Sequence, residues 1–129
     1  QYSVAFHIGL SRAVQNLPTT AKLKFDVVYL NLGNAYDTST GIFTCPMDGV
    51  YVFHWTILTI KGKYFYTDFK VNGKVVGRSH PNAVNQNRAA SSSVVYQMKK
   101  NDKAWIEPHH TGQYAHPEWS FFSGYRLYA

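Results

Sequence analysis

The six histidines are the residues of this 129-residue chain whose type and spacing could first support chemistry. His109, His110 and His116 share one short stretch, and His80 lies in a second polar stretch. Imidazole nitrogens bind zinc or copper well, but a structural zinc site normally takes four ligands at recognised spacing, and no cysteine pair is present. We therefore expect no metal site, and interpret these histidines as exposed loop side chains with polar or stacking roles.

Hydrolytic chemistry would need a nucleophile, a base and an orienting carboxylate in one place. Ser91, Ser92 and Ser93 are not framed by glycines as in a nucleophile elbow, and the seven Asp and Glu residues are spread thinly along the chain. The single cysteine, Cys45, cannot form an internal disulfide, and we interpret it as a small buried apolar residue. We expect a protein that binds rather than reacts, not an enzyme, and no cofactor.

The composition narrows the classes of partner. Thirteen Lys and Arg against seven Asp and Glu give a formal net charge of +6, which favours anionic partners without identifying one. The cations are scattered, and no zinc-finger, basic-helix or RNA-binding signature is present, so we expect no nucleic acid partner. No apolar run approaches the roughly 20 residues of a membrane-spanning helix, and we expect no membrane insertion. Residues 1–129 fit a single domain, and the start of the chain is interpreted as that of a mature or trimmed domain.

The elements that must position these side chains are β-strands, since no apolar pattern at helical spacing persists for three turns. The clearest strand is 50–60, in which Tyr51, Phe53, Trp55 and Ile57 fall on one face. Further strands are expected at 4–10, 23–32, 42–44, 64–71, 74–77, 89–98, 104–107 and 119–128, with loops at 11–20, 31–41 and 108–118. Asn72-Gly73 predicts a tight hairpin turn, because a type I′ turn needs positive φ at both central residues.

Strand reversal at every loop predicts which loops share an end of the molecule. The stretches 61–63, 79–88 and 108–118 should gather at one end, and 72–73, 100–103 and both termini at the other. The first end would combine aromatic rings, cations and hydrogen-bond donors, a mixture suited to sugars and to their acidic substituents. The candidate ligand-binding residues are therefore Lys61, Lys63, Tyr64, His80, Arg88, His109, His110, Tyr114 and His116.

The spacing of several residues resembles that of the complement C1q globular domain, a relative of the tumour necrosis factor fold. The residues that carry this resemblance are Phe25, Asn31, Tyr36, Phe43, Gly49, Tyr51 and Phe53, with Ala5, Phe6 and Gly9 in the opening strand and Phe122, Ser123, Gly124, Tyr125, Leu127 and Tyr128 in the closing strand. Trp55 stands where the family usually has Phe or Tyr, and Arg126 where it usually has an apolar residue. The resemblance covers nearly the whole chain and implies an all-β jelly-roll sandwich of about ten antiparallel strands.

The resemblance also implies a compact homotrimer. Phe6, Phe121, Phe122, Tyr125 and Tyr128 provide a physical reason, because these rings on the terminal strands exceed what one sandwich face can bury, and some should pack against a neighbour. No Gly-X-Y repeat is present, so no collagen stalk is expected in this chain. Some family members bind calcium through carboxylates in the loop that here spans 79–88. Calcium prefers ionised carboxylates, and this loop has none, so we expect no calcium site.

The function implied by the resemblance is that of a secreted, extracellular recognition module. It would be a lectin-like protein of innate immunity that binds microbial or other glycans, including bacterial surface polysaccharides. Two alternatives stay open: a cytokine-like ligand for a cell-surface receptor, and a structural subunit of an extracellular assembly. The sequence alone does not separate these functions.

Overall fold

The computed structural model describes residues 3–129, and this part of the chain contains twelve strands and no helix. Five strands form one sheet in the order β3, β1, β12, β6, β9, and five form the facing sheet in the order β4, β5, β10, β7, β8. Their bounds are β1 Ala5–Gly9, β3 Val27–Leu32, β4 Tyr36–Asp37, β5 Ile42–Thr44, β6 Gly49–Thr59, β7 Thr67–Val71, β8 Lys74–Ser79, β9 Arg88–Met98, β10 Lys103–Pro108 and β12 Phe121–Tyr128. All neighbouring strands are antiparallel. The expected all-β sandwich is confirmed.

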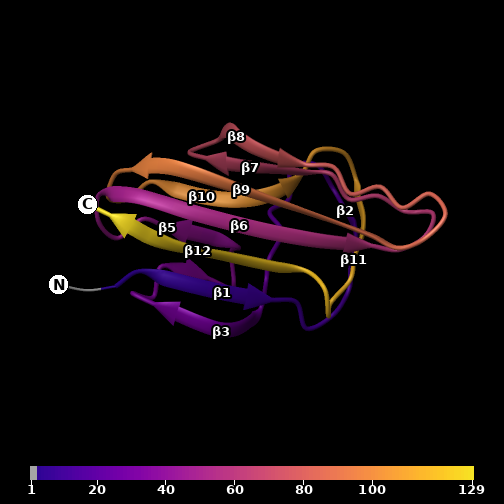
Figure 1. The fold of residues 1–129 in the computed structure, drawn as a ribbon, viewed down its shortest axis with the longest axis horizontal. Coiled ribbons are helices and arrows are strands. Elements are labelled where there is room, and N and C mark those ends of the chain that lie inside the picture. The colour runs from indigo at the N-terminus through magenta and orange to yellow at the C-terminus, as the bar shows by residue number, and fades with distance from the viewer. Residues whose placement is uncertain (1–2) are drawn as a thin grey trace.

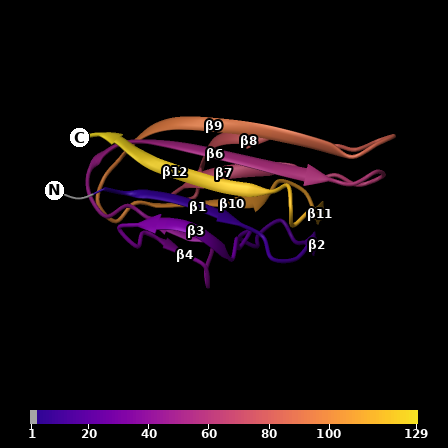
Figure 2. The same ribbon diagram turned by 60° about the horizontal axis from the view of Figure 1, so that its bottom comes forward.

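The arrangement of the loops follows the strand-reversal prediction. β1 begins and β12 ends at one end of the sandwich, while the turn after β6 and the loop between β8 and β9 project at the other end (Figure 1). The two sheets approach each other along β8 and β9, which are in contact and are drawn close together in Figure 2. There the Ser92 hydroxyl donates a hydrogen bond of 3.0 Å to the Arg78 carbonyl.

The core between the sheets is built largely from aromatic rings. The face of β6 predicted from its alternation is buried throughout, including Tyr51, Phe53 and Trp55. Phe69 of the facing sheet meets Phe53 at 4.9 Å and stacks on Trp55 at 5.1 Å between ring centroids. Cys45 is also fully buried, as expected, and burial raises the pKa of its thiol. Burial of large rings on this scale is the main force holding the sheets together.

Hydrogen bonds explain two features of the sequence pattern. The Asn31 side chain donates to the Tyr36 carbonyl at 2.9 Å and accepts from the Tyr36 amide at 3.2 Å, which fixes the start of β4 beside the end of β3. The Arg126 guanidinium donates two hydrogen bonds, of 3.1 and 2.8 Å, to the Asp48 carbonyl. A charged residue is therefore accommodated in the closing strand because it binds the turn that leads into β6.

Three expected loops contain strand residues. β2 Val14–Leu17 and β11 Gly112–Ala115 pair with each other in a third, two-stranded sheet, so 11–20 and 108–118 are not wholly irregular. The expected 31–41 loop likewise holds the end of β3 and all of β4. β2 is short and exposes Gln15 and Asn16, the latter at a φ of 54°, so it lacks the alternation by which strands are recognised.

Strand β7 begins three residues later than predicted, at Thr67. Tyr64 instead forms an isolated bridge with Asn82, and the Phe65 amide donates to the Pro81 carbonyl. The Asn72-Gly73 turn is confirmed, with φ of 51° and 85° at its two residues.

The outer face of the sheet that contains β1, β12 and β6 carries no Asp, Glu, Lys or Arg at its registered positions within the described residues. These positions are Val27, Leu30, Leu32, Ala5, His7, Gly9, Phe121, Ser123, Tyr125, Tyr128, Val50, Val52, His54, Thr56, Leu58, Gln97, Val95, Ser93, Ser91 and Ala89. His7 and His54 flank Ser123 in one row across this face. The His7 ring stacks on Phe121 at 5.3 Å, and the His54 ring lies 6.5 Å from that of Tyr125.

The rings of the terminal strands divide between this outer face and the core. Phe6 and Phe122 are buried inside this chain, 4.9 Å apart, so these two need no neighbour to cover them. Tyr125 and Tyr128 are exposed, and Phe121 is half-buried. Only part of the predicted surplus of rings is therefore available for a partner.

Candidate ligand-binding site

The loop end of the sandwich is assembled by backbone hydrogen bonds between segments far apart in the sequence. The turn after β6 pairs with the loop between β8 and β9 through Gly62 and Ala83, at 2.6 Å. The stretch before β7 accepts hydrogen bonds from His109, through the Tyr66 carbonyl at 2.9 Å, and from Gln113, through the Tyr64 carbonyl at 3.0 Å. Three of the expected loop segments are therefore joined into one surface.

A column of three stacked rings stands on this surface. We use "ring column" for Tyr64, Tyr66 and His80. Tyr66 lies between the other two, with centroids 4.6 Å from Tyr64 and 3.7 Å from His80. Its hydroxyl accepts a hydrogen bond of 3.0 Å from Asn82, and the His110 ring approaches its edge at 5.9 Å. Both faces of Tyr66 are thus covered, and a ligand could stack only on the outer rings of the column.

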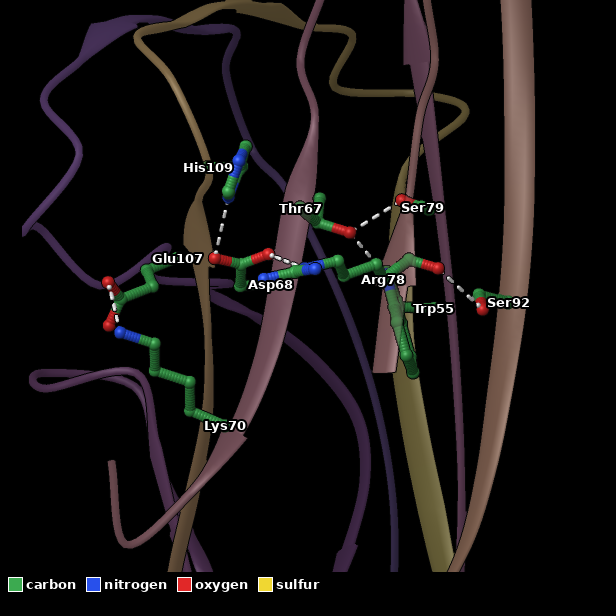
Figure 3. Close-up of polar contacts among 9 residues, drawn as sticks. All are labelled: Trp55, Thr67, Asp68, Lys70, Arg78, Ser79, Ser92, Glu107 and His109. Atoms are coloured by element: carbon green, nitrogen blue, oxygen red, sulfur yellow. Dashed lines mark hydrogen bonds and ion pairs between the residues drawn. The ribbon is translucent and has the colours of Figure 1, made fainter. Parts of the chain in front are cut away.

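Asp68 anchors the histidine beside the ring column. Its carboxylate accepts from Nδ1 of His109 at 3.0 Å and from Nε of Arg78 at 2.9 Å, and the two donors approach from different sides (Figure 3). Burial raises the pKa of this carboxyl, but the hydrogen bonds and charges of His109 and Arg78 outweigh burial, and the net shift is downward. With Nδ1–H directed at Asp68, the other ring nitrogen of His109 is left for a ligand.

Next to Asp68, a chain of hydrogen bonds links the site to the core. Nε1 of Trp55 donates to the Thr67 hydroxyl at 2.8 Å, and that hydroxyl lies 2.5 Å from the Ser79 hydroxyl (Figure 3). Trp55 and Thr67 are fully buried. Because a buried indole needs an acceptor, these bonds fix the register of β7 and β8, and thereby the positions of Asp68 and His80.

The nine residues predicted for the site fall into separate groups. Tyr64 and His80 belong to the ring column, and His109 and His110 lie beside it, with their centroids 4.8 Å apart. Lys61 and Lys63 are exposed on the adjoining turn, and exposed Arg88 opens β9 opposite Thr59. Tyr114 and His116 contact each other at 6.3 Å. Within residues 3–129, no ring contact joins this last pair to the ring column, because Tyr114 pairs with Gln15 on the small β2–β11 sheet.

Three residues of the site were missed by the sequence analysis: Tyr66, Asp68 and Arg78. Tyr66 and Asp68 could have been found from the alternation of inward and outward side chains along the strand. Phe65, Thr67 and Phe69 are buried, so the two residues between them share the opposite face. Nothing local in the sequence marks Arg78, whose role depends on the pairing of Asp68 with it across β7 and β8.

In the part of the chain that the structure describes, the candidate site carries cations that no carboxylate engages. Asp68 is already engaged by two donors, whereas Lys61, Lys63 and Arg88 make no ion pair within the described residues. No group of three or more His, Cys, Asp or Glu side chains in residues 3–129 is arranged to hold a metal ion. The site therefore offers rings, imidazole nitrogens and cations to a ligand.

Comparison with known proteins agrees with this architecture. The profile of the C1q domain matches residues 5–127, and the chain belongs to the C1q domain family. Among solved structures, the globular domain of zebrafish complement 1qA superposes with a TM-score of 0.81 at 20% identity, covering 98% of each chain. Murine APRIL superposes with a TM-score of 0.77 at 12% identity, covering 98% of this chain and 100% of the other. Domains of this family are non-enzymatic recognition or ligand modules.

The curated relatives are longer proteins. Caprin-2 of Danio rerio is 33% identical over 133 aligned positions, which include 99% of this chain but 14% of that protein. Complement C1q tumor necrosis factor-related protein 2 of Mus musculus is 28% identical over 132 positions, including 97% of this chain and 43% of that protein. The chain thus spans less than half the length of either relative. No helix within residues 3–129 is long and apolar enough to cross a membrane.

Proposed function

We propose that this chain is a secreted, extracellular recognition module that binds acidic glycans, such as those of bacterial surface polysaccharides, in the manner of a lectin of innate immunity. The observation that carries the proposal is the ring column with unpaired cations beside it. The apolar face of a sugar ring can lie on an aromatic ring, while hydroxyl, phosphate or sulfate groups accept hydrogen bonds from imidazole and ammonium groups.

The test is binding to an array of immobilised neutral and acidic polysaccharides. His80→Ala with His110→Ala removes an outer ring of the column and the ring at its edge, and leaves the buried anchor of Asp68 in place. We expect binding of acidic polysaccharides to fall about tenfold or more, with thermal stability nearly unchanged. Binding should also weaken as salt is raised, because exposed charges are screened beyond about 8 Å at physiological ionic strength.

The matched control changes charge at the opposite end. Lys99→Gln, Lys100→Gln and Lys103→Gln alter three exposed lysines near the 100–103 turn. If this variant loses polysaccharide binding while the histidine variant retains it, the proposed site lies at the wrong end of the molecule.

We further propose that the chain acts as a homotrimer, as C1q and tumour necrosis factor-like domains commonly do. The supporting observation is the outer face without Asp, Glu, Lys or Arg, which exposes Tyr125 and leaves Phe121 half-buried. Interfaces between identical subunits are rich in such apolar and aromatic surface. Light scattering at micromolar concentration should give three times the chain mass, and a monomer mass would contradict the proposal.

A cytokine-like ligand is the second candidate function. It is favoured by relatives named for tumor necrosis factor and by the fold shared with murine APRIL. Saturable binding to a cell-surface protein that excess polysaccharide does not inhibit would favour this function over glycan recognition.

A further inference from the structure

A cavity of about 470 Å³ lies apart from the ring column, between β2, the segment that follows it and the turn before β5. Its lining is mainly apolar, with two lysines and a threonine. The residues are Val14, Leu17, Ala21, Lys22, Leu23, Lys24 and Thr40. None of them belongs to the ring column, and the volume falls within the range of roughly 300–1,000 Å³ found for small-molecule sites.

The walls of the cavity are held in place by the surrounding fold. Leu23 is buried, and its amide donates to the Ile106 carbonyl at 2.7 Å, which docks the 18–24 segment onto β10. Opposite, the Asp37 carboxylate accepts from the Ser39 amide at 2.9 Å and so orders the turn that carries Thr40. A Cβ on Gly41 would lie 2.7 Å from the Leu23 carbonyl oxygen, so this turn and the 18–24 segment are in close contact. The cavity is therefore bounded by ordered backbone on two sides.

The two lysines at the cavity have no carboxylate partner within residues 3–129. The Lys22 ammonium lies 4.5 Å from the centroid of the Trp105 ring, a cation–π contact that leaves hydrogens of the ammonium group free to donate. Glu107, whose carboxylate contacts Trp105, is already engaged by two donors. One oxygen binds Lys70 at 3.0 Å and the other accepts from Nε1 of Trp105 at 2.7 Å.

We propose that this cavity binds a small amphipathic anion, a compound with an apolar chain and a single carboxylate such as a medium-chain fatty acid. The chain would lie against Val14, Leu17 and Ala21, which are half-buried, and the carboxylate would bind Lys22 and Lys24 with Thr40 as a further donor. Both the polarity and the charge of the lining favour this class of ligand. The apolar side chains match the hydrocarbon chain, and the unpaired ammonium groups match the carboxylate.

The experiment titrates the folded chain with decanoate and follows the backbone amide resonances by NMR. Residues 14–24 and 40 should shift together and saturate. Decanol, which lacks the charge, and acetate, which lacks the chain, should each bind at least about tenfold more weakly. Equal binding of acetate and decanoate would overturn the proposal, as would shifts confined to the outer face around Tyr29 and Tyr125.

Two variants locate the site. Lys22→Gln with Lys24→Gln should weaken decanoate binding about tenfold while leaving decanol unchanged. The control, Lys99→Gln with Lys100→Gln, removes the same charge at the far end and should leave decanoate binding intact. Equal loss in both variants would show attraction to net charge alone and overturn the proposal. The result is independent of polysaccharide binding, which uses other residues.

Discussion

Asp68 shows how one residue organises the candidate site. The side chain sits on β7 with little exposure, and a buried carboxylate is costly unless it is paired and hydrogen-bonded. His109 and Arg78 provide that pairing from two other segments of the chain. Both partners are more exposed than Asp68, so this buried carboxylate holds the Arg78 and His109 side chains in place at the surface. Loss of the carboxylate should disturb both side chains.

Replacing Asp68 with Asn should lower the free energy of unfolding at pH 7 by about 1–3 kcal/mol, since two charge-assisted hydrogen bonds are lost or weakened. The pKa of Asp68 is lowered in the folded state, so the stability it contributes is present above the unfolded pKa of about 3.9 and is lost as pH falls through the folded value. The difference between wild type and Asp68→Asn in urea denaturation should therefore shrink below about pH 4.

Glu118→Gln is the control for that measurement, because Glu118 is an exposed acid that forms no ion pair within the described residues. It should change stability little at any pH. A difference for Asp68→Asn that stays constant down to pH 2 would show that the carboxylate charge does not contribute.

At the scale of residues, the sequence correctly predicted which side chains point into the core along a strand whose residues alternate between buried and less buried positions. Tyr51, Phe53 and Trp55 are inward as expected, because the period of two is a local property of a strand. Asp68 and Arg78 escaped prediction because their interaction depends on which strand pairs with which, and a linear pattern does not contain that pairing.

At the scale of elements, the close approach of β8 to β9 depends on Gly77. A Cβ at this position would lie 2.5 Å from Cγ2 of Val94 and 3.0 Å from Cη2 of Trp55. The glycine is thus required for space, since it lets one sheet close over the buried indole of the other. The Trp55–Thr67 hydrogen bond lies in the same region.

Gly77→Ala should destabilise the protein by about 1–3 kcal/mol, because overpacking forces neighbouring strands apart. Urea denaturation measures the loss, and the double variant Gly77→Ala/Val94→Ala should recover part of it, since Val94→Ala removes the methyl group that clashes. No recovery relative to the sum of the single variants would mean that the close approach is not the cause.

The elements that sequence analysis missed share a physical reason. β2, β4 and β11 are short, and each is stabilised by a partner rather than by its own pattern. The pairing of Tyr114 with Gln15 turns a predicted site residue away from the ring column. The long strands, the Asn72-Gly73 turn and the clustering of loops at each end were predictable, because they follow from local chemistry and chain reversal.

At the scale of the whole molecule, the proposed homotrimer would cover His7 and His54. The groups that face His7 are Leu30 and Tyr29 from β3, and Ser123 and Phe121 from β12. His54 faces Ser123 and Tyr125 from β12, and Ser93 from β9. No Asp, Glu, Lys or Arg is among these neighbours, so a charge introduced here and covered by a second copy of this face would lack a local counter-charge.

Replacing His54 with Asp should therefore dissociate the trimer, because a second copy of this face would cover an unpaired charge, which is unfavourable. We expect light scattering to give a trimer for the wild type and smaller species for His54→Asp. His54→Gln, which adds no charge, should remain trimeric, and a His54→Asp mass equal to that of the wild type would contradict the prediction.

The outer face would then set the strength of binding to a repetitive surface without touching the ligand. Three sites that act together on one polymer bind far more tightly than one, and this avidity disappears when the subunits separate. A separated subunit would keep its ring column and its cations, and yet would lose most of its hold on a polymer that carries many copies of the acidic group.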